Sequence, residues 1–119
     1  MGDNIMRVMY CNHLHELEIL RIENELQEIA KLMKTPFFDT RMYKGMILVY
    51  DPKGILKYPV SHKLDGLNLR GPFLFTGNNT IEKDFKSLNM EEIRLLEQKL
   101  VREKQELQEE LQQELEMGE

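Results

Sequence analysis

The sequence predicts an α+β fold, with a small mixed or antiparallel sheet, one packed helix and a long C-terminal oligomerisation helix. Several short strand-like segments come before residue 88, without the regular alternation with helices that βαβ units show. One amphipathic stretch near residues 23–34 has helical spacing. From residue 89 to residue 117 the chain contains no glycine or proline. We therefore expect an α+β domain over residues 1–87 and a long amphipathic helix over residues 88–119 that extends it.

Composition restricts the class of protein. The chain has 119 residues, enough for one small domain, and 31% of them are charged. The longest apolar run covers residues 46–50, whereas a helix that spans a bilayer needs about 20 residues. No secretory signal is visible, and the single cysteine, Cys11, excludes an internal disulfide framework and a cysteine-based zinc site. We expect a cytoplasmic protein with no membrane partner.

The first third of the chain predicts two strands and a helix. In order, we expect a strand over residues 5–11, a turn over 12–15, an alternating strand over 16–22 and a helix over 23–34. Thr35-Pro36 ends the helix, because the residue before a proline avoids the α region. A single longer helix that begins near Leu14 is the alternative.

The middle of the chain reads as further strands joined by turns. Asp51-Pro52-Lys53-Gly54 has the pattern of a type I turn, and Pro59 confines its strand to an edge or an early end. The expected elements are strands over residues 37–43 and 46–50, a hairpin partner over 55–60, a polar connector over 61–68, a last strand over 69–76 and a break at 77–80.

The C-terminal segment carries the clearest pattern. Asn89 and Glu92 have the spacing of a capping box. Beyond them an apolar stripe, interrupted once by Lys104, advances in steps of three and four residues that repeat every eleven, which favours a nearly straight helix. Such a helix would be roughly 43 Å long and would outrun its domain. We expect a homo-oligomer through this stripe, with a frayed tail as the alternative; its members are Ile93, Leu96, Leu100, Leu107, Leu111 and Leu115.

Charge is distributed unevenly along the chain. The net charge is −5, yet residues 41–90 carry eight basic and four acidic side chains, whereas residues 91–119 carry four and ten. A protein that grips long nucleic acid is usually basic overall, so we expect no such partner. The basic middle could hold a small anion. The alternative is that its lysines are simply solvated surface.

Catalytic and metal-binding patterns are weak. His13 and His15 would share a face on a strand, and Glu16 or His62 could add a ligand, but a pair of exposed turn residues is the favoured interpretation. Cys11 beside His13 resembles a nucleophile only by composition. No phosphate-cradling glycine loop is present in the sequence. We expect no enzyme, no metal and no cofactor.

A candidate ligand site lies between residues 58 and 79, where aromatic, cationic and amide side chains gather. Such groups can stack a base and hold a phosphate or ribose. For the phenylalanines of this stretch, a place in the core is the favoured alternative. The side chains that we expect to bind the ligand, in a pocket completed by a neighbouring subunit, are Arg70, His62, Asn78, Tyr58, Phe75 and Thr76.

Over residues 6–98 the order of motifs resembles a family of small proteins of unknown function encoded by phages, plasmids and Firmicute-type mobile elements. That family has a Leu-Pro-Leu-Asn-Arg-like step, a Gly-x-Phe-Leu strand and a Ser-Leu-x-x-Glu helix start. Ser61 and His62 replace the Asn-Arg pair of the first motif. The corresponding segments here are Tyr58-Pro59-Val60-Ser61-His62, Gly71-Pro72-Phe73-Leu74-Phe75 and Phe85-Lys86-Ser87-Leu88.

The resemblance implies a phage protein acting in the bacterial cytoplasm. By architectural analogy, it suggests an anti-defence "sponge", an oligomer that sequesters a small nucleotide immune signal without turning it over. The alternative is a phage inhibitor or adaptor that binds a host protein through an acidic C-terminal helix. A metal-dependent enzyme is a third, weaker alternative.

Overall fold

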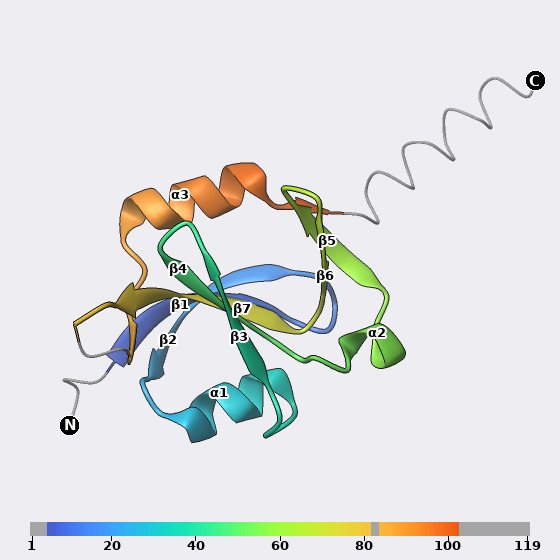
Figure 1. Ribbon diagram of the computed structural model, residues 1–119, viewed down its shortest axis with the longest axis horizontal. Helices are drawn as coiled ribbons and strands as arrows, with labels where there is room; N and C mark the ends of the chain where they lie inside the picture. Colours follow the sequence, from blue (N-terminus) through green and yellow to red (C-terminus); the bar gives the residue numbers. More distant parts are fainter. Residues whose placement is uncertain (1–4, 82–83, 103–119) are drawn as a thin grey trace, which may run out of the picture.

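The computed structural model describes residues 5–81 and 84–102, and there the protein is built mainly from antiparallel strands (Figure 1). In chain order the elements are β1 (Ile5–Cys11), β2 (Leu17–Glu23), α1 (Leu26–Met33), β3 (Asp39–Tyr43), β4 (Met46–Tyr50), α2 (Gly54–Lys57), β5 (Val60–Leu64), β6 (Leu67–Arg70), β7 (Phe73–Asn79), β8 (Asp84–Lys86), α3 (Met90–Lys99) and β9 (Val101–Arg102).

The larger sheet has the strand order β2-β1-β7-β4-β3, with β8 paired to the far part of β7. Its central strands are buried on both faces, because every residue from Val8 to Cys11 and from Phe73 to Gly77 is buried. Strands buried in this way read as near-continuous apolar runs and not as alternating ones. The strands predicted over residues 5–11 and 46–50 are confirmed as β1 and β4.

Helices cover the two faces of this sheet (Figure 1). Helix α1 packs on one face through Ile29 and Met33, which meet Met6, Val8 and Tyr10 of β1. Helix α3 packs on the opposite face, where its buried residues share a core with β1, β4 and β7. That second core contains Met9, Cys11, Met46, Leu48, Phe73, Phe75, Leu88, Ile93, Leu96 and Leu100.

A second, smaller sheet has the order β6-β5-β9 and lies on the same side as α3. Its inner residues, Leu64 and Leu69, join the core beneath α3. The turn between β5 and β6 is formed by Asp65 and Gly66, both with positive φ (48° and 86°). Asp-Gly suits such a two-residue hairpin turn, since both positions require left-handed backbone.

The predicted fold class is wrong in its helical part. Helix α3 begins at the expected place, with a complete capping box between Asn89 and Glu92, but it ends at Lys99. Leu100 is extended (φ −77°, ψ 116°), and Val101–Arg102 form β9. Instead of one packed helix and one projecting helix, the described chain has two helices packed on opposite faces of an antiparallel sheet.

Helix α3 ends at Lys99 because the chain then pairs with the small sheet, and the apolar face of the helix is buried in its own domain. Ile93, Leu96 and Leu100 are buried in the core, so these three residues of the predicted oligomer stripe contact their own chain. The following residues pair with the open edge of β5, His62 opposite Arg102, which satisfies backbone groups there. The other predicted interface residues, Leu107, Leu111 and Leu115, lie outside the described residues.

The expected hairpin partner over residues 55–60 is also wrong. Residues 54–57 form the short helix α2, because both oxygens of Asp51 accept hydrogen bonds from this turn. The strand that follows pairs with β6 and not with β4, whose neighbours are β3 and β7. The predicted connector at 61–68 is therefore most of the small sheet.

The predicted last strand, residues 69–76, is divided at Gly71-Pro72 between β6 and β7. Gly77 does not break β7, because it pairs with Met46 on one side and with Lys86 of β8 on the other. Helix α1 starts three residues later than the predicted residue 23, since residues 17–23 belong to β2. Among the residues described here, no helix is long and apolar enough to cross a membrane.

Candidate ligand pocket between the two sheets

A pocket of about 410 Å³ opens between the larger sheet and the smaller one, beside α2. Its volume lies within the range of small-molecule sites, about 300–1,000 Å³. Strands β3, β4 and β7, the turn into α2, and β6 all contribute to its walls. The lining residues are Arg41, Leu48, Tyr50, Asp51, Pro52, Gly54, Ile55, Leu67, Asn68, Leu69, Arg70 and Phe73.

Two arginines give the pocket its positive charge. Arg41 comes from the edge strand β3 and is exposed, and it has no ion-pair partner among the described residues. Arg70, on β6, is half-buried and donates one hydrogen bond, from Nη1 to the backbone oxygen of Tyr58 at 2.8 Å. A guanidinium has five N–H donors, so Arg70 retains donors for an anion. Both side chains can therefore meet an anionic ligand.

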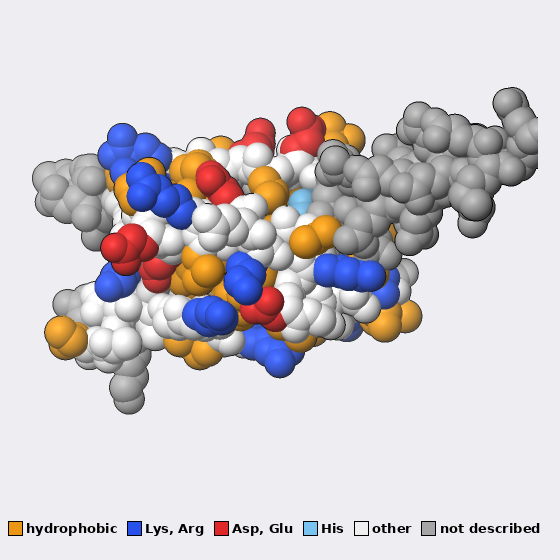
Figure 2. Space-filling view, turned by 90° about the horizontal axis from the view of Figure 1, so that it is seen from above, with side chains coloured by type: hydrophobic (Ala, Val, Ile, Leu, Met, Phe, Trp, Pro, Cys, Tyr) orange, Lys and Arg blue, Asp and Glu red, His pale blue; other side chains and the backbone are white. Residues whose placement is uncertain are grey.

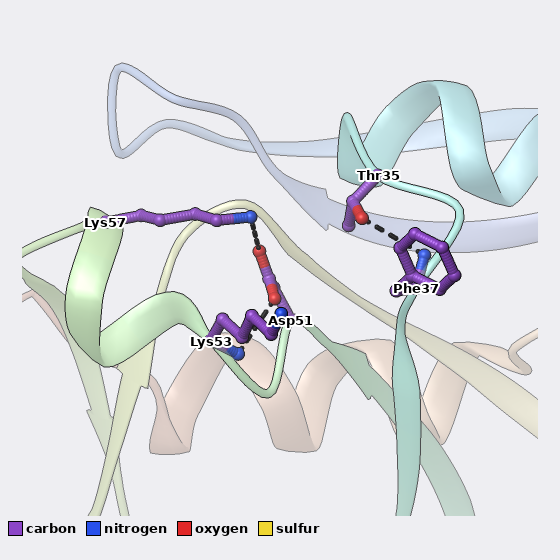
Figure 3. A network of polar contacts seen from close by, with 5 residues as sticks. All are labelled: Thr35, Phe37, Asp51, Lys53 and Lys57. Atoms are coloured by element: carbon purple, nitrogen blue, oxygen red, sulfur yellow. Dashed lines mark hydrogen bonds and ion pairs between the residues drawn. The ribbon is translucent and has the colours of Figure 1, made fainter.

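Among the described residues, the one carboxylate in the pocket lining is neutralised by its neighbours. Asp51 is buried, and its Oδ2 accepts a hydrogen bond from Nζ of Lys57 at 2.9 Å, while Oδ1 accepts one from the backbone N–H of Lys53 (Figure 3). Burial alone would raise the pKa of Asp51, but these hydrogen bonds outweigh it and hold the pKa below its usual value. The hydrogen bond between Lys57 and Asp51 also raises the pKa of Lys57. Asp51 consequently shapes the turn and does not repel an anion as a free carboxylate would.

The rest of the lining is apolar, aromatic or amide-bearing. Leu48, Leu69 and Phe73 are buried and form part of the floor. Tyr50 is half-buried, and Asn68 is exposed on β6. An aromatic ring, a carboxamide and two guanidinium groups around an apolar floor can hold a flat molecule that carries a negative group.

A hydrogen bond joins the small sheet to the larger one near this pocket. The hydroxyl of Tyr43, the last residue of β3, donates to Oδ2 of Asp65 in the β5–β6 turn at 2.6 Å. Nζ of Lys99 lies 3.8 Å from the other oxygen of Asp65. Burial and the bond to Asp65 raise the pKa of Tyr43 to about 12, and the same bond lowers the pKa of Asp65. Three elements from distant parts of the sequence thus meet at this turn.

Of the six predicted ligand residues, only Arg70 lines the pocket. Tyr58 is adjacent to it, and its backbone oxygen anchors Arg70. Phe75 is fully buried and packs edge-on against Tyr43 and Phe73, so its ring is a core ring. Thr76 is fully buried as well and donates to the backbone oxygen of Gly77.

His62 lies in a buried polar cluster between β1 and β5. Its Nδ1 is 2.7 Å from Oγ of Ser61 and 3.7 Å from Sγ of Cys11, and its ring packs edge-on against Phe73. Cys11, Ser61 and His62 are at most 3% exposed. The cluster joins the two sheets, and none of its three residues is among those that line the pocket.

Asn78 lies elsewhere, in a second hollow of about 380 Å³. Its Nδ2 faces the sulfur of Met42 at 3.8 Å. The described residues that line this hollow are Thr40, Ile47, Asn78, Thr80, Asp84 and Phe85. The six residues predicted from the sequence are therefore not brought together in one site.

Sequence reasoning did not identify Arg41, Asn68 and Tyr50 as candidates. Arg41 and Tyr50 approach β6 only through the pairing of β3 with β4 and the packing of the two sheets, which no local pattern reveals. A local signal did exist for Asn68: Asp65-Gly66 between apolar residues predicts a hairpin, and that hairpin places Asn68 and Arg70 on one strand.

The other candidate groups do not form a site in this part of the chain. His13 and His15 lie in the turn between β1 and β2, not on a strand. Within residues 5–81 and 84–102, no three histidine, cysteine or acidic side chains are placed to hold one metal ion. Figure 2 shows basic and acidic side chains interspersed on the face seen from above, with no broad basic patch.

No protein-family model matches the chain, and neither the curated proteins nor the solved structures contain a match. Function is therefore argued from the pocket itself, whose cationic rim and partly aromatic lining define the chemistry that it can recognise.

Proposed function

We propose that this protein binds a small anionic ligand with a flat ring system, of which a nucleotide is the model, in the pocket between its two sheets. The ligand is held and released unchanged. The observation that carries this proposal is the placement of Arg41 and Arg70 on different strands around one pocket that also contains Tyr50 and Asn68. Guanidinium groups recognise phosphates, and a tyrosine ring can stack on a base.

Binding without chemistry suits the groups in this pocket. A general base or nucleophile must be within reach of the ligand and free to act. Asp51, the one carboxylate that the described residues contribute to the lining, is held by Lys57 and by the N–H of Lys53. Cys11, Ser61 and His62 are not among the lining residues. The proposed activity is therefore sequestration and not turnover.

The resemblance to phage and mobile-element proteins provides the biological setting of the proposal. In that setting the protein is an anti-defence protein that withdraws a nucleotide immune signal in the bacterial cytoplasm. Homo-oligomerisation stays a prediction, now without Ile93, Leu96 and Leu100 as free interface residues. A host-protein adaptor remains the alternative, and it would be favoured if the pocket takes no nucleotide.

Calorimetric titration of the full chain with mononucleotides, cyclic dinucleotides and ADP-ribose-type compounds tests the proposal. A charge-assisted hydrogen bond contributes about 1.5–3 kcal/mol, so Arg41→Ala and Arg70→Ala should each weaken binding roughly ten- to a hundred-fold. Ligand released by heat should be chemically intact.

Arg94→Ala is the matched control, because Arg94 is an exposed arginine of α3 outside the pocket. It should bind as the parent does. Melting curves for each variant separate loss of affinity from loss of folding, which matters for Arg70 because of its bond to Tyr58. A parent protein that binds none of these compounds would refute the proposal.

A further inference from the structure

Strand β3 is an open edge of the larger sheet. It pairs with β4 on one side, and among the described residues no strand pairs with its other side (Figure 1). Natural edge strands are usually blocked by a lysine, a proline or a bulge that prevents another chain from pairing there. Residues 39–43 contain neither lysine nor proline, and all five pair with β4 without a shift in register. The edge can therefore accept a further strand.

The hairpin geometry shows which backbone groups of β3 face this edge. The turn that joins β3 to β4 is Lys44-Gly45, and both residues have positive φ (46° and 79°), as in a type I′ turn. The residue pair that closes such a turn exchanges both backbone hydrogen bonds, and every second pair along the two strands does the same. Counting back from the turn, the odd-numbered residues of β3 bond to β4. The N–H and C=O groups of Thr40 and Met42 consequently point toward the open edge.

The side chains along this edge are exposed and of two kinds. Met42 is 55% exposed, and Phe37, two residues before the strand, is 77% exposed. Asp39 and Arg41 are exposed as well, and neither has an ion-pair partner in the part of the chain that the structure describes. Because residues two apart share a face of a strand, Asp39 and Arg41 lie together on one face of β3.

These residues complement themselves when two copies of β3 pair antiparallel about a two-fold axis at Thr40. The two Thr40 residues then lie opposite each other and exchange both backbone hydrogen bonds. Asp39 of each copy lies opposite Arg41 of the second copy, which gives two identical pairs of opposite charge. On the other face of the sheet, Phe38 lies opposite Met42. Registers centred on Asp39 or on Arg41 would instead place like charges opposite each other.

The other edge of the larger sheet, β2, offers less complementarity. Across a two-fold axis a residue can face only residues an even number of positions away, which excludes Glu18 opposite Arg21. Arg21 can face Glu23 of a second copy only in a register centred on Ile22. The chain turns directly after that point, because the N–H of Glu25 donates to the backbone oxygen of Glu23 at 2.9 Å. Only a short part of β2 could therefore pair in that register.

We infer that this protein forms a two-fold symmetric dimer in which β3 of one copy pairs with β3 of a second copy about Thr40. The pairing joins the two larger sheets into one continuous sheet. This inference goes beyond the proposed function, although Arg41 also lies at the rim of the ligand pocket. A guanidinium has five N–H donors, so Arg41 bonded to Asp39 of the second copy keeps donors for an anion. The two roles of Arg41 are therefore compatible.

Exchanging the charges across the edge tests both the interface and its register. Sedimentation velocity over a range of concentrations gives the mass of the full chain and of its variants. The parent should approach twice 14.2 kDa. Asp39→Arg and Arg41→Asp each place like charges opposite each other, so each should raise the dissociation constant of the dimer at least about tenfold. An equimolar mixture of the two variants should associate again, because every pair across the edge then joins opposite charges.

Arg21→Asp is the matched control, because Arg21 is an exposed arginine on the opposite edge strand, β2. It should leave the dissociation constant unchanged. A parent that stays monomeric at every concentration overturns the inference. It is also overturned if both charge variants dimerise as the parent does, or if the two variants fail to associate when mixed, since either result places association on another surface.

Hydrogen exchange at single amides provides a second readout, on the backbone. The amides of Thr40 and Met42 should exchange slowly in the dimeric parent and at least about tenfold faster in Asp39→Arg, because their N–H groups lose their acceptors. The amide of Arg41, which bonds to β4, should stay protected in both proteins and thereby show that the variant is folded. Fast exchange at Thr40 and Met42 in a dimeric parent would overturn the inference.

Failure of the dimer and failure of the proposed function give different results. A monomeric parent that binds a nucleotide would refute the dimer and leave the proposed function standing. A parent that dimerises through β3 but binds no nucleotide would refute the proposed function and leave the dimer standing.

Discussion

At the scale of single residues, Tyr43 shows how a long-range contact sets a local property. Its hydroxyl is bonded to Asp65, 22 residues further along the chain, and its ring packs against Phe75 in the core. Burial and this bond favour the protonated phenol, which is why its pKa rises to about 12 from 10.0. The contact therefore contributes stability only while the phenol keeps its proton.

Raising the pH should remove that contribution over a defined interval. Because the folded pKa lies above the unfolded one, the stabilisation is complete below pH 10 and is lost as the pH rises toward 12. Tyrosinate absorbance of the parent should contain a component that titrates near 12, and Tyr43→Phe should lack it. Retention of that component in the variant would show that another tyrosine is responsible.

Gly77 provides a second residue-scale prediction. A Cβ at this position would lie 2.5 Å from the backbone oxygen of Ser87 and 2.9 Å from Cγ of Lys86. Gly77→Ala should therefore push β8 away from β7 and lower the free energy of unfolding by about 1–3 kcal/mol. Denaturant titration measures the change. Gly54→Ala is the control: a Cβ there meets Arg70 at an ordinary 3.6 Å, so it should cost little. Equal stability of both variants would contradict the packing described.

Single residues also show which parts of the candidate site could not be predicted from the sequence. Arg70 was a candidate because an arginine between turn signals stands out locally; it lines the pocket, and its role in binding stays a prediction. Phe75 and Thr76 were assigned to the ligand, but burial on the central strand β7 makes them core residues. Only the neighbours of β7 on both sides, β1 and β4, determine that outcome, and they are distant in sequence.

At the scale of elements, α3 separates what local sequence determines from what it does not. The helix start is local, since Asn89 and Glu92 cap each other, and it was predicted correctly. The helix end depends on the edge of β5, to which the next residues pair, and no glycine or proline marks it. Because the apolar stripe continues past Leu100, the helix predicted from it was longer than α3.

Helix α3 should act as a core element. Leu96, on the buried face of this helix, is 0% exposed, so Leu96→Ala should lower the free energy of unfolding by about 2–5 kcal/mol. Leu26→Ala on α1 is the matched control, because Leu26 is 66% exposed and its truncation should change stability little. Chemical denaturation of both variants gives the comparison. A small effect at Leu96 would mean that α3 is not part of the core.

At the scale of the whole molecule, the buried cluster of Cys11, Ser61 and His62 joins the two sheets. Cys11 is the one cysteine of the chain and has no exposed surface. Its thiol can meet a reagent only when the small sheet separates from the larger one or the protein unfolds. The rate at which the Cys11 thiol reacts therefore measures how often the two sheets separate or the protein unfolds.

Reaction of Cys11 with a chromogenic disulfide reagent should be slow in native buffer. Its rate should increase with denaturant as steeply as global unfolding does, because one cooperative event exposes the thiol. A shallower dependence would reveal that the small sheet opens by itself. Rapid reaction without denaturant would contradict the burial of the cluster.

The position of β1 between β2 and β7 in the larger sheet has a consequence for synthesis on the ribosome. This strand is made well before its partner β7, which begins at Phe73, and before α3, which closes the core over both and begins at Met90. Until then a nascent chain can pair β1 only with β2, leaving apolar residues such as Met9 and Cys11 open to water. Strand pairings between segments this distant in sequence slow folding and leave aggregation-prone apolar surface exposed. The fold can therefore protect its interior only after α3 has been made, and expression should depend on chaperones.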